Sequence, residues 1–415
     1  MILDYNRLKL GLLAARRGGR VKALLIIIAA GALAACAGSS APGDVAAKAV
    51  IAPAPPAVSI DPATGEASVT IRVMTWNVEG LPIPIRFGRA HALEEIGDAL
   101  ASMRARGEAP HILLVQEGFM RGPMERLISR SGYAYVSRGP RAGDEAAGSA
   151  EEMGEPWRLR GEGLGKVLDG GLYILSDFPI LDTQTEAFAS CAGFDCLANK
   201  GVMLARIRIP GAPDPLAVLN THLNSRSATR APIARANLAH RAQIDALERF
   251  VRDTAREHEP FIFGGDFNMA GSPQRWSYAV PLEQNAFANA FCLQDTAHCD
   301  VSAMPVEEID PRTRQDQHGF HDGTEIRVRP VRLAMAHSAA TDDSLSDHGA
   351  FVVDYRLSWD MSQRQVAQGP TTQAQATQDA PRQLPGLFLS RSASLAGEAG
   401  PAGEASLRDA GYAQP

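Results

Sequence analysis

The stretch PFIFGGDFN, residues 260–268, combines the two features on which the fold depends. Phe261, Ile262 and Phe263 form a short apolar run that is typical of a strand buried on both faces. Two glycines end the run, and Asp266 and Asn268 follow at once. The strand therefore presents polar side chains where it ends.

The same pattern of an apolar run closed by polar residues recurs along the chain. It is found in SVTIRVMTWN (68–77), HILLVQEG (111–118) and LAVLNTHLN (216–224), while SDHGAFVVDYRL (346–357) has the polar residues first. Further apolar runs, GGLYILS (170–176) and GVMLARIRI (201–209), also predict strands. The intervals 90–106 and 231–256 have helical spacing, so the alternation predicts an α/β fold with sheets between helices.

The overall composition is that of a folded, soluble protein. The chain has 415 residues, of which 45% are hydrophobic and 21% charged, and its formal net charge is −6. Such a charge is not typical of a nucleic-acid binder, whose surface is usually basic. We expect one α/β domain over residues 68–358, including a long polar surface loop from about residue 138 to 170.

The N-terminus is typical of an export signal. Four basic residues between positions 16 and 22 precede an apolar run at 23–35, which is short for a membrane span. The run closes with LAAC at 33–36 and resembles the lipobox of bacterial lipoproteins; a buried core helix is the alternative. The resemblance implies a signal peptide at 1–35, acylation of Cys36 and anchoring in the bacterial cell envelope. Ala37 favours the outer membrane, with the domain in the periplasm or at the surface.

The segments that flank the domain are low in complexity. We expect residues 36–67, rich in Ala and Pro, to form a tether, and residues 359–415 to be a disordered tail. Removal of residues 1–35 takes away six basic residues and one acidic residue, which leaves a net charge of about −11. The exported form would be clearly acidic.

Four further cysteines fit an oxidising compartment. They form two close pairs, and sequence separation favours Cys191 with Cys196 and Cys292 with Cys299 among the three pairings that four cysteines allow. Zinc binding is the alternative, although neither pair has the CxxC spacing.

The polar residues that follow the strands are mainly carboxylates and amides, with two histidines. Oxygen ligands of this kind suit Mg²⁺ or Mn²⁺, and histidine can transfer protons near neutral pH. The chain has no HExxH, GxSxG or GxxxxGK[ST] motif, so the signatures of zinc proteases, serine hydrolases and P-loop proteins are missing.

Taken in order, these motifs resemble those of the endonuclease/exonuclease/phosphatase superfamily. The resemblance rests on TWN at 75–77, QE at 116–117, THLN at 221–224, GGDFN at 264–268 and SDH at 346–348. It implies a four-layer α/β sandwich in which two mixed β-sheets pack face to face between helices. The active site would lie at one end of the sandwich and hydrolyse a phosphodiester.

The resemblance also implies a role for each polar residue. Glu117 would bind Mg²⁺, or Mn²⁺ as the alternative ion, with Asn77 and Asp347 as further ligands. Asp266 and Asn268 would orient the attacking water and a phosphate oxygen, and His348 and His222 would flank the phosphate. Superfamily members usually hold the SDH histidine with an upstream acid; Asp316 is our candidate, with Asp310 as the alternative.

The substrate is less clearly encoded than the reaction. NKGV at 199–202 and GLYILSDFPI at 171–180 resemble the neutral sphingomyelinase branch, which implies a phospholipid headgroup as substrate, with Lys200 and Asn224 in contact with it. A hairpin turn is the structural alternative for NKGV.

Two other functions stay open. A secreted nuclease would need a basic cleft, which arginines 226, 230 and 235 could supply, and the third alternative is a non-catalytic binding lipoprotein. The partners expected are thus a phosphodiester, lipid or nucleic acid, and a membrane reached through acylated Cys36. The sequence indicates no protein partner.

Overall fold

The computed structural model describes residues 55–279, 287–338 and 344–361. The predicted signal peptide, Cys36 and most of the predicted tether and tail lie outside these residues. Strand β1 and the start of β2 fall inside the stretch expected to be tether, and β14 ends at Asp360, inside the expected tail. The strands extend beyond the expected domain because Ala67 and Trp359 are buried partners in the β2–β14 ladder.

The first sheet has the strand order β11-β13-β14-β2-β3-β6-β4, and β1 pairs with β2 beside this path. It is mixed, because β2 and β3 run parallel while β14 and β2 run antiparallel. Its strands are β1 (Ser59–Ile60), β2 (Glu66–Asn77), β3 (Ile112–Gln116), β4 (Tyr135–Arg138), β6 (Tyr173–Ser176), β11 (Asp300–Ala303), β13 (Arg327–His337) and β14 (Ala350–Asp360).

The second sheet has the order β12-β10-β9-β8-β7-β5 and is also mixed. Strands β9 and β10 run parallel, whereas β10 and β12 run antiparallel. Its strands are β5 (Ala146–Ala147), β7 (Ile180–Phe188), β8 (Gly201–Ile207), β9 (Leu216–His222), β10 (Phe261–Asp266) and β12 (Asp316–His321).

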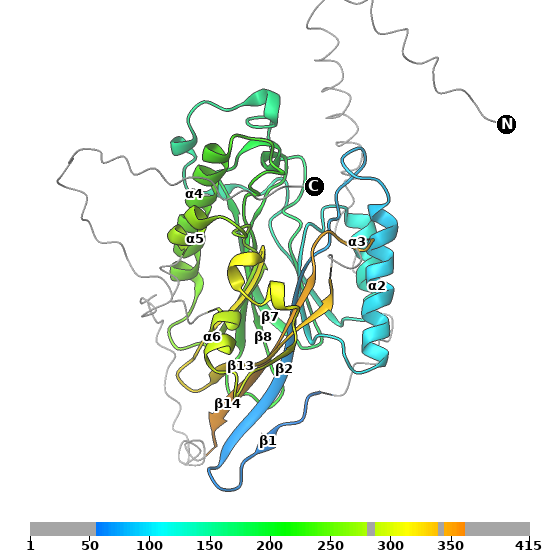
Figure 1. Ribbon diagram of the computed structural model, residues 1–415, viewed down its shortest axis with the longest axis vertical. Coiled ribbons are helices and arrows are strands. Elements are labelled where there is room, and N and C mark those ends of the chain that lie inside the picture. Colours follow the sequence, from blue (N-terminus) through cyan, green and yellow to red (C-terminus); the bar gives the residue numbers. More distant parts are fainter. Residues whose placement is uncertain (1–54, 280–286, 339–343, 362–415) are drawn as a thin grey trace, which may run out of the picture.

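Helices cover the outer faces of both sheets (Figure 1). Helices α2 and α3 lie on one side, and α4 and α5 on the other. The helices are α2 (Arg89–Ala105), α3 (Arg121–Ser131), α4 (Ile233–Thr254), α5 (Pro273–Ala279) and α6 (Ala288–Gln294), and the 3₁₀ turns are η1 (Glu151–Met153), η2 (Arg158–Arg160), η3 (Gly193–Leu197), η5 (Val306–Glu308) and η6 (Pro311–Thr313). Among the described residues, none of these helices has both the length and the apolar character needed to cross a bilayer.

Three apolar cores separate the four layers. The central core joins the inner faces of the two sheets, for example Ile71 and Leu114 from the first and Val218 from the second. A second core packs α4 and α5 on the second sheet, and a third packs α2 and α3 on the first. The predicted four-layer sandwich of two mixed sheets is therefore the observed fold.

The sequence prediction also holds for several local features. The helices expected at 90–106 and 231–256 are α2 and α4, and the favoured disulfides, Cys191–Cys196 and Cys292–Cys299, are both formed. The long surface loop expected around residues 138–170 contains three short elements, β5, η1 and η2.

Candidate active site

The register of the second sheet places three of the predicted residues side by side. Asp266 at the end of β10 lies opposite His222 at the end of β9 and opposite Asp316 at the start of β12. In the first sheet, Asn77 ends β2 beside Gln116, the residue before Glu117. Parallel strands place their carboxyl ends at one edge of a sheet, so both sets of residues reach the same end of the sandwich.

The two sheets are joined at this end by the side chain of Asn77. Its Nδ2 donates a hydrogen bond to Asp266 Oδ2 at 3.1 Å, and its Oδ1 accepts one from the backbone N–H of Glu79 at 3.0 Å. The amide of Asn77, predicted to be a metal ligand, is thus engaged on both sides and holds Asp266 in place.

Asp266 is surrounded by donors. Its Oδ1 accepts a bond from the backbone N–H of Asn268 at 2.9 Å, and His222 Nε2 lies 3.3 Å from Oδ2. Burial acts to raise the pKa of Asp266, but the charge of His222 and its contact with the carboxylate outweigh burial and hold that pKa well below its usual range. Asp266 is therefore a permanent anion, suited to orient a water molecule or a donor.

His348 and Asp316 form a buried pair. His348 Nδ1 lies 2.8 Å from Asp316 Oδ2, whereas the alternative acid, Asp310, accepts a bond from the backbone N–H of Arg312 at the start of η6. Burial alone would lower the pKa of His348, but the Asp316 carboxylate raises it well above its ordinary value. His348 is thus a cation near neutral pH, with Nδ1 occupied and Nε2 left for another contact.

Glu117 stands at the edge of this group of side chains, which we call the pit; its members are Asn77, Glu117, His222, Asp266, Asp316 and His348. Its Oε1 lies 3.9 Å from His222 Nε2, and its side chain is 19% exposed. Among the described residues, its carboxylate accepts no hydrogen bond that would compete with a ligand. Its φ of 58°, together with 52° at Asn268 and 47° at Glu79, places three site residues in the left-handed region. Strained backbone of this kind persists where surrounding contacts enforce it, commonly at functional sites.

A buried arginine joins the TWN and SDH segments. Arg89 at the start of α2 donates to the carbonyls of Val78 at 2.9 Å and Glu79 at 2.7 Å, and also to the carbonyl of Leu345. Ser346 Oγ donates to Asn77 O at 2.6 Å and adds a second link. These bonds set the position of Asp347 and His348 relative to the end of β2.

Glu79 adds a negative charge at this corner. Its carboxylate pairs with Arg86 at 2.9 Å and Arg89 at 3.5 Å. Burial, and then the nearby charge of Asp347, raise its pKa. Asp347 and Glu117 are thus both close enough to repel Glu79, and a nearby cation would relieve that repulsion.

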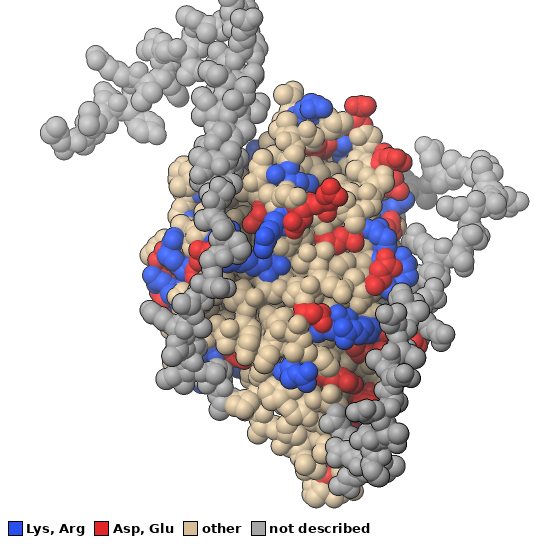
Figure 2. Space-filling model, turned by 180° about the vertical axis from the view of Figure 1, so that it is seen from behind, with Lys and Arg blue, Asp and Glu red and all other residues tan. Residues whose placement is uncertain are grey.

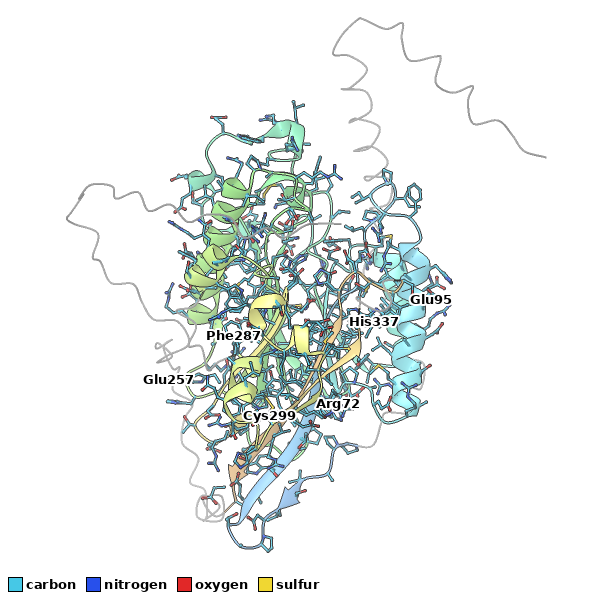
Figure 3. The ribbon with its side chains drawn as sticks, in the orientation of Figure 1. Arg72, Glu95, Glu257, Phe287, Cys299 and His337 are labelled. Atoms are coloured by element: carbon cyan, nitrogen blue, oxygen red, sulfur yellow. A yellow bond between two sulfur atoms is a disulfide. The ribbon has the colours of Figure 1, made fainter. Side chains whose placement is uncertain are left out.

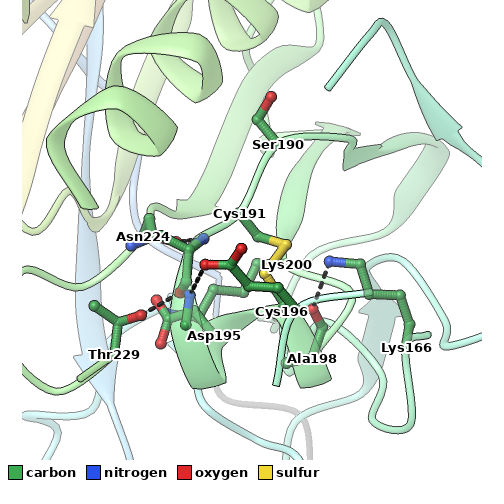
Figure 4. Close-up of a disulfide and its surroundings, with 12 residues drawn as sticks. Lys166, Ser190, Cys191, Asp195, Cys196, Ala198, Lys200, Asn224 and Thr229 are labelled. Atoms are coloured by element: carbon green, nitrogen blue, oxygen red, sulfur yellow. Dashed lines mark hydrogen bonds and ion pairs between the residues drawn. A yellow bond between two sulfur atoms is a disulfide. The ribbon is translucent and has the colours of Figure 1, made fainter. Parts of the chain in front are cut away.

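Lys200 lies on the floor of the site beside His222. Its Nζ is 2.9 Å from His222 Nε2 and 2.9 Å from Asp195 Oδ2. Lys200 and Asp195 lie beside the Cys191–Cys196 disulfide (Figure 4). Asp195 belongs to η3, which the Cys191–Cys196 disulfide closes, and it also accepts a bond from the backbone N–H of Ser225 at 2.7 Å. Although burial opposes ionisation, Lys200 keeps the pKa of Asp195 below its usual range.

Asn224 is placed differently from the expectation. Its Oδ1 accepts a bond from the backbone N–H of Ala192, and its Nδ2 donates to Ser225 O. Both amide groups of this fully buried side chain therefore hold backbone at the disulfide loop, and the predicted contact with substrate has no support in this geometry.

The donors at this end fit a hard divalent cation at Glu117. The carboxylates of Glu117 and Asp347 are the kind of oxygen ligands that Mg²⁺ prefers, and partial exposure of Glu117 leaves room for the waters that this ion retains. Asp266, Asp316 and His348 form a second cluster whose ligand atoms lie within 4.8 Å of one another. In that cluster, however, Asp316 and His348 already bond to each other.

The structure thus gathers nearly all of the predicted residues in one pit. Residues 77, 117, 222, 266, 268, 316, 347, 348 and the side chain of Lys200 converge there, whereas Asn224 and Asp310 serve local backbone. The sequence reasoning missed Glu79, Arg89 and Asp195. Their positions were the signal available: Glu79 lies two residues after TWN, Asp195 lies between Cys191 and Cys196, and Arg89 directly precedes the expected helix start.

Comparison with known proteins identifies the family. The model of the endonuclease/exonuclease/phosphatase family matches residues 74–285. The chain belongs to this family. A phospholipase C of Staphylococcus aureus is 26% identical over 165 residues, which is 39% of this chain and 47% of the relative. The chain thus spans about half the length of the curated relatives that it matches.

Solved structures of similar fold include two bacterial proteins. The beta toxin of Staphylococcus aureus has 17% identity and a TM-score of 0.47, covering 68% of this chain and 99% of that one. Sphingomyelinase C from Streptomyces griseocarneus has 17% identity and a TM-score of 0.44, covering 69% and 99% of the two chains.

Proposed function

We propose that this member of the family is a divalent-metal-dependent phosphodiester hydrolase of the sphingomyelinase-like kind, which cleaves phospholipid headgroups. The observation that carries the proposal is the gathering of three acids, Glu117, Asp266 and Asp316, with three basic side chains, His222, His348 and Lys200, at one end of the sandwich. A phosphodiester is an anion, so an attacking oxygen reaches phosphorus only where cations and donors neutralise the phosphate.

The residues divide this work between them. Lys200 supplies a fixed positive charge beside His222, and His348, protonated through its contact with Asp316, supplies a second charge and a proton for the leaving oxygen. Asp266, held by Asn77 and Asn268, orients the attacking water. Mg²⁺, when bound by Glu117 and Asp347, would neutralise a phosphate oxygen.

Two loops at the pit support a lipid rather than a soluble substrate. One follows Glu79 and exposes Ile83 (59%) and Phe87 (71%). The other exposes Leu159 (82%); it packs on η3, since a Cβ at Gly161 would meet Phe194, the neighbour of Asp195. Exposed apolar side chains beside a site commonly mark contact with a membrane or partner. The relative named phospholipase C supports the same substrate class.

Nucleic acid is the less favoured substrate. Of the three arginines expected to form a basic cleft, Arg235 is bound to Glu162 at 2.6 Å, with Glu162 nearly buried, which removes it from such a cleft. On the face seen in Figure 2, basic and acidic side chains alternate in small groups rather than forming one basic field. Duplex DNA binding depends on such a field.

The N-terminal motif supports a location for this activity. We infer that Cys36 is acylated and anchors the domain at the bacterial cell envelope, in the outer membrane. More than one acyl chain would be needed for firm anchoring, at about 0.8 kcal/mol per buried methylene. An anchored hydrolase would meet phospholipid without electrostatic steering.

The proposal is tested by a panel of phosphodiesters with Mg²⁺, Mn²⁺ and chelator. The substrates are vesicles of sphingomyelin, phosphatidylcholine and phosphatidylinositol, together with plasmid DNA, RNA and bis-p-nitrophenyl phosphate. We expect headgroup release from lipid that requires the divalent ion and falls at least a hundredfold in Glu117→Gln and His348→Ala.

Glu95→Gln is the matched control, because this half-exposed glutamate lies on the outer side of α2 (Figure 3). It should keep wild-type activity. Full activity in both site variants would refute the proposal, and plasmid nicking without lipid hydrolysis would replace it by a nuclease. Absence of turnover with every diester and ion would indicate a binding protein.

A further inference from the structure

A small hollow lies next to Glu117, on the far side of Gly171 from the catalytic pit. Its lining includes Arg121, Arg138 and Arg141, together with Asp169 and Tyr173. Gly171 lines the hollow and packs on Glu117, because a Cβ added there would lie 3.1 Å from Glu117 Cα. The backbone N–H of Gly118 donates a hydrogen bond to Gly171 O at 2.9 Å, which links Gly171 to the residue that follows Glu117.

Tyr173 supplies a buried polar group to this hollow. Its side chain is 5% exposed, and among the described residues its hydroxyl makes no hydrogen bond. Tyr173 lines the hollow beside Asp169, and the Arg138 guanidinium lies over its ring, 5.8 Å from the ring centroid. Burial raises the pKa of Tyr173 to about 12, which keeps its O–H as a donor at all physiological pH values.

The lining carries an excess of positive charge. Arg121 and Arg138 share Glu125, at 3.1 and 3.6 Å, and Asp169 Oδ1 accepts a bond from the backbone N–H of Ala142. Arg141 has no ion pair within the part of the chain that the structure describes. Three arginines thus line the hollow against one acid, Asp169. Glu125 lies beside this lining, and so does Asp144, whose carboxylate accepts a bond from the backbone N–H of Arg141 at 2.8 Å.

We propose that this hollow binds a second phosphate of the substrate, so that the preferred substrate is a phospholipid whose headgroup carries a phosphate monoester besides the diester. The inference rests on the proposed function and specifies its substrate class. Guanidinium forks and a phenolic O–H are suited to the oxygens of a phosphate dianion, and Arg is preferred for such recognition. Free inorganic phosphate has the same chemistry and is the simplest probe.

The first test measures binding without catalysis. Inorganic phosphate is titrated calorimetrically into the full chain in the presence of chelator, so that no divalent ion contributes. Arg141→Gln removes a cation that has no ion pair to break, and Tyr173→Phe removes only the hydroxyl. Each should weaken phosphate binding about tenfold, the value of one charge-assisted hydrogen bond.

Arg252→Gln is the matched control, because Arg252 lies on α4, is about half exposed and is only 3.8 Å from Asp253. It should bind phosphate as the wild type does. The inference is overturned if the wild type binds no phosphate. It is also overturned if Arg141→Gln and Tyr173→Phe bind phosphate as tightly as the control, Arg252→Gln.

The second test measures selection between substrates. Hydrolysis of phosphatidylinositol 4-phosphate is compared with hydrolysis of phosphatidylinositol, each in detergent micelles. Phosphatidic acid is added to the phosphatidylinositol micelles so that both kinds of micelle carry the same surface charge. The wild type should favour the phosphorylated lipid about tenfold in kcat/KM, and Arg141→Gln should lose most of this preference. Arg141→Lys should restore part of it.

The two proposals fail in different ways. If the wild type does not hydrolyse bis-p-nitrophenyl phosphate, the proposed hydrolase function is contradicted. The calorimetric comparison would still show whether the hollow binds phosphate. Turnover of both lipids at equal rates, with or without Arg141, would contradict the second-phosphate site alone. A preference that phosphatidic acid reproduces would assign the effect to surface charge and overturn the inference.

Discussion

Asp316→Asn isolates the contact that is proposed to charge His348. The change keeps the size and shape of the side chain but removes the negative charge that lies 2.8 Å from His348 Nδ1. Both side chains are well shielded, at 6% and 18% exposure, so solvent screens the interaction only weakly. A hydrogen bond between charged groups in such a setting contributes about 1.5–3 kcal/mol.

If the proposed reaction uses protonated His348, the bond to Asp316 stabilises the transition state, and the variant loses that stabilisation. Loss of about 1.5–3 kcal/mol corresponds to a fall in kcat/KM of about 10- to 150-fold. The pKa of His348 should also fall in the variant, because the carboxylate that raises it is gone. The alkaline limb of the pH profile of kcat/KM should therefore move to lower pH.

Stability should change with pH in the same direction. A histidine whose pKa is raised by folding stabilises the native state fully below its ordinary value of about 6.5, and this contribution is lost as pH rises through the raised pKa. Urea unfolding of wild type and variant should thus differ more at pH 6 than at alkaline pH.

Asp310→Asn is the control, because among the described residues the Asp310 carboxylate accepts a bond from the backbone N–H of Arg312, at the start of η6. It should leave the pH profile unmoved. An unshifted alkaline limb in Asp316→Asn, or an equal shift in both variants, would refute the role given to Asp316.

Three further predictions concern residues outside the catalytic groups. Arg89→Met should lower the free energy of unfolding, measured by urea titration, by about 2–4 kcal/mol, because the carbonyls of Val78, Glu79 and Leu345 lose their donor. It should also lower kcat more than Arg86→Met does. Equal effects of the two variants would contradict this role of Arg89. The double variant Cys191→Ser/Cys196→Ser should lower the free energy of unfolding by about 2 kcal/mol and reduce activity, because Asp195 is held less firmly. The double variant Cys292→Ser/Cys299→Ser should lower the free energy of unfolding by a similar amount without changing kcat. A lower kcat in the second double variant would contradict a local effect of the first disulfide. Cys36→Ala should move the protein from the membrane to the soluble fraction on cell fractionation; continued membrane association would remove the proposed anchor.

The fold and the centre of the site were predictable from local sequence because each catalytic group directly follows or precedes a strand. Asp266, His222 and Asp316 become neighbours once β9, β10 and β12 pair in register. Short apolar runs closed by polar residues predict β9 and β10. Strand β12, DQHGFH, has no such run and was not among the expected strands. Asp316 was preferred over Asp310, and the contact with His348 fits that preference.

Other features depend on partners that are distant in the chain and have no local signature. Arg89 contacts Leu345, 256 positions away, and nothing in the helix around Arg89 indicates that link. Asn224 lies in a family motif but is engaged by Ala192 across 32 positions, which explains why its expected substrate role finds no support. The hollow at Arg141 is assembled from segments around residues 121, 138–141 and 169–173 and becomes visible only after folding.

The central claim is that the pit at Glu117 holds a hard divalent cation. The most direct measurement is a crystal structure of the full chain soaked in Mn²⁺, with anomalous difference maps to locate the ion. We predict an anomalous peak about 2.1 Å from a Glu117 carboxylate oxygen in the wild type, and no peak at this position in Glu117→Gln. A peak between Asp316 and His348 instead, or no bound ion in the wild type, would contradict it.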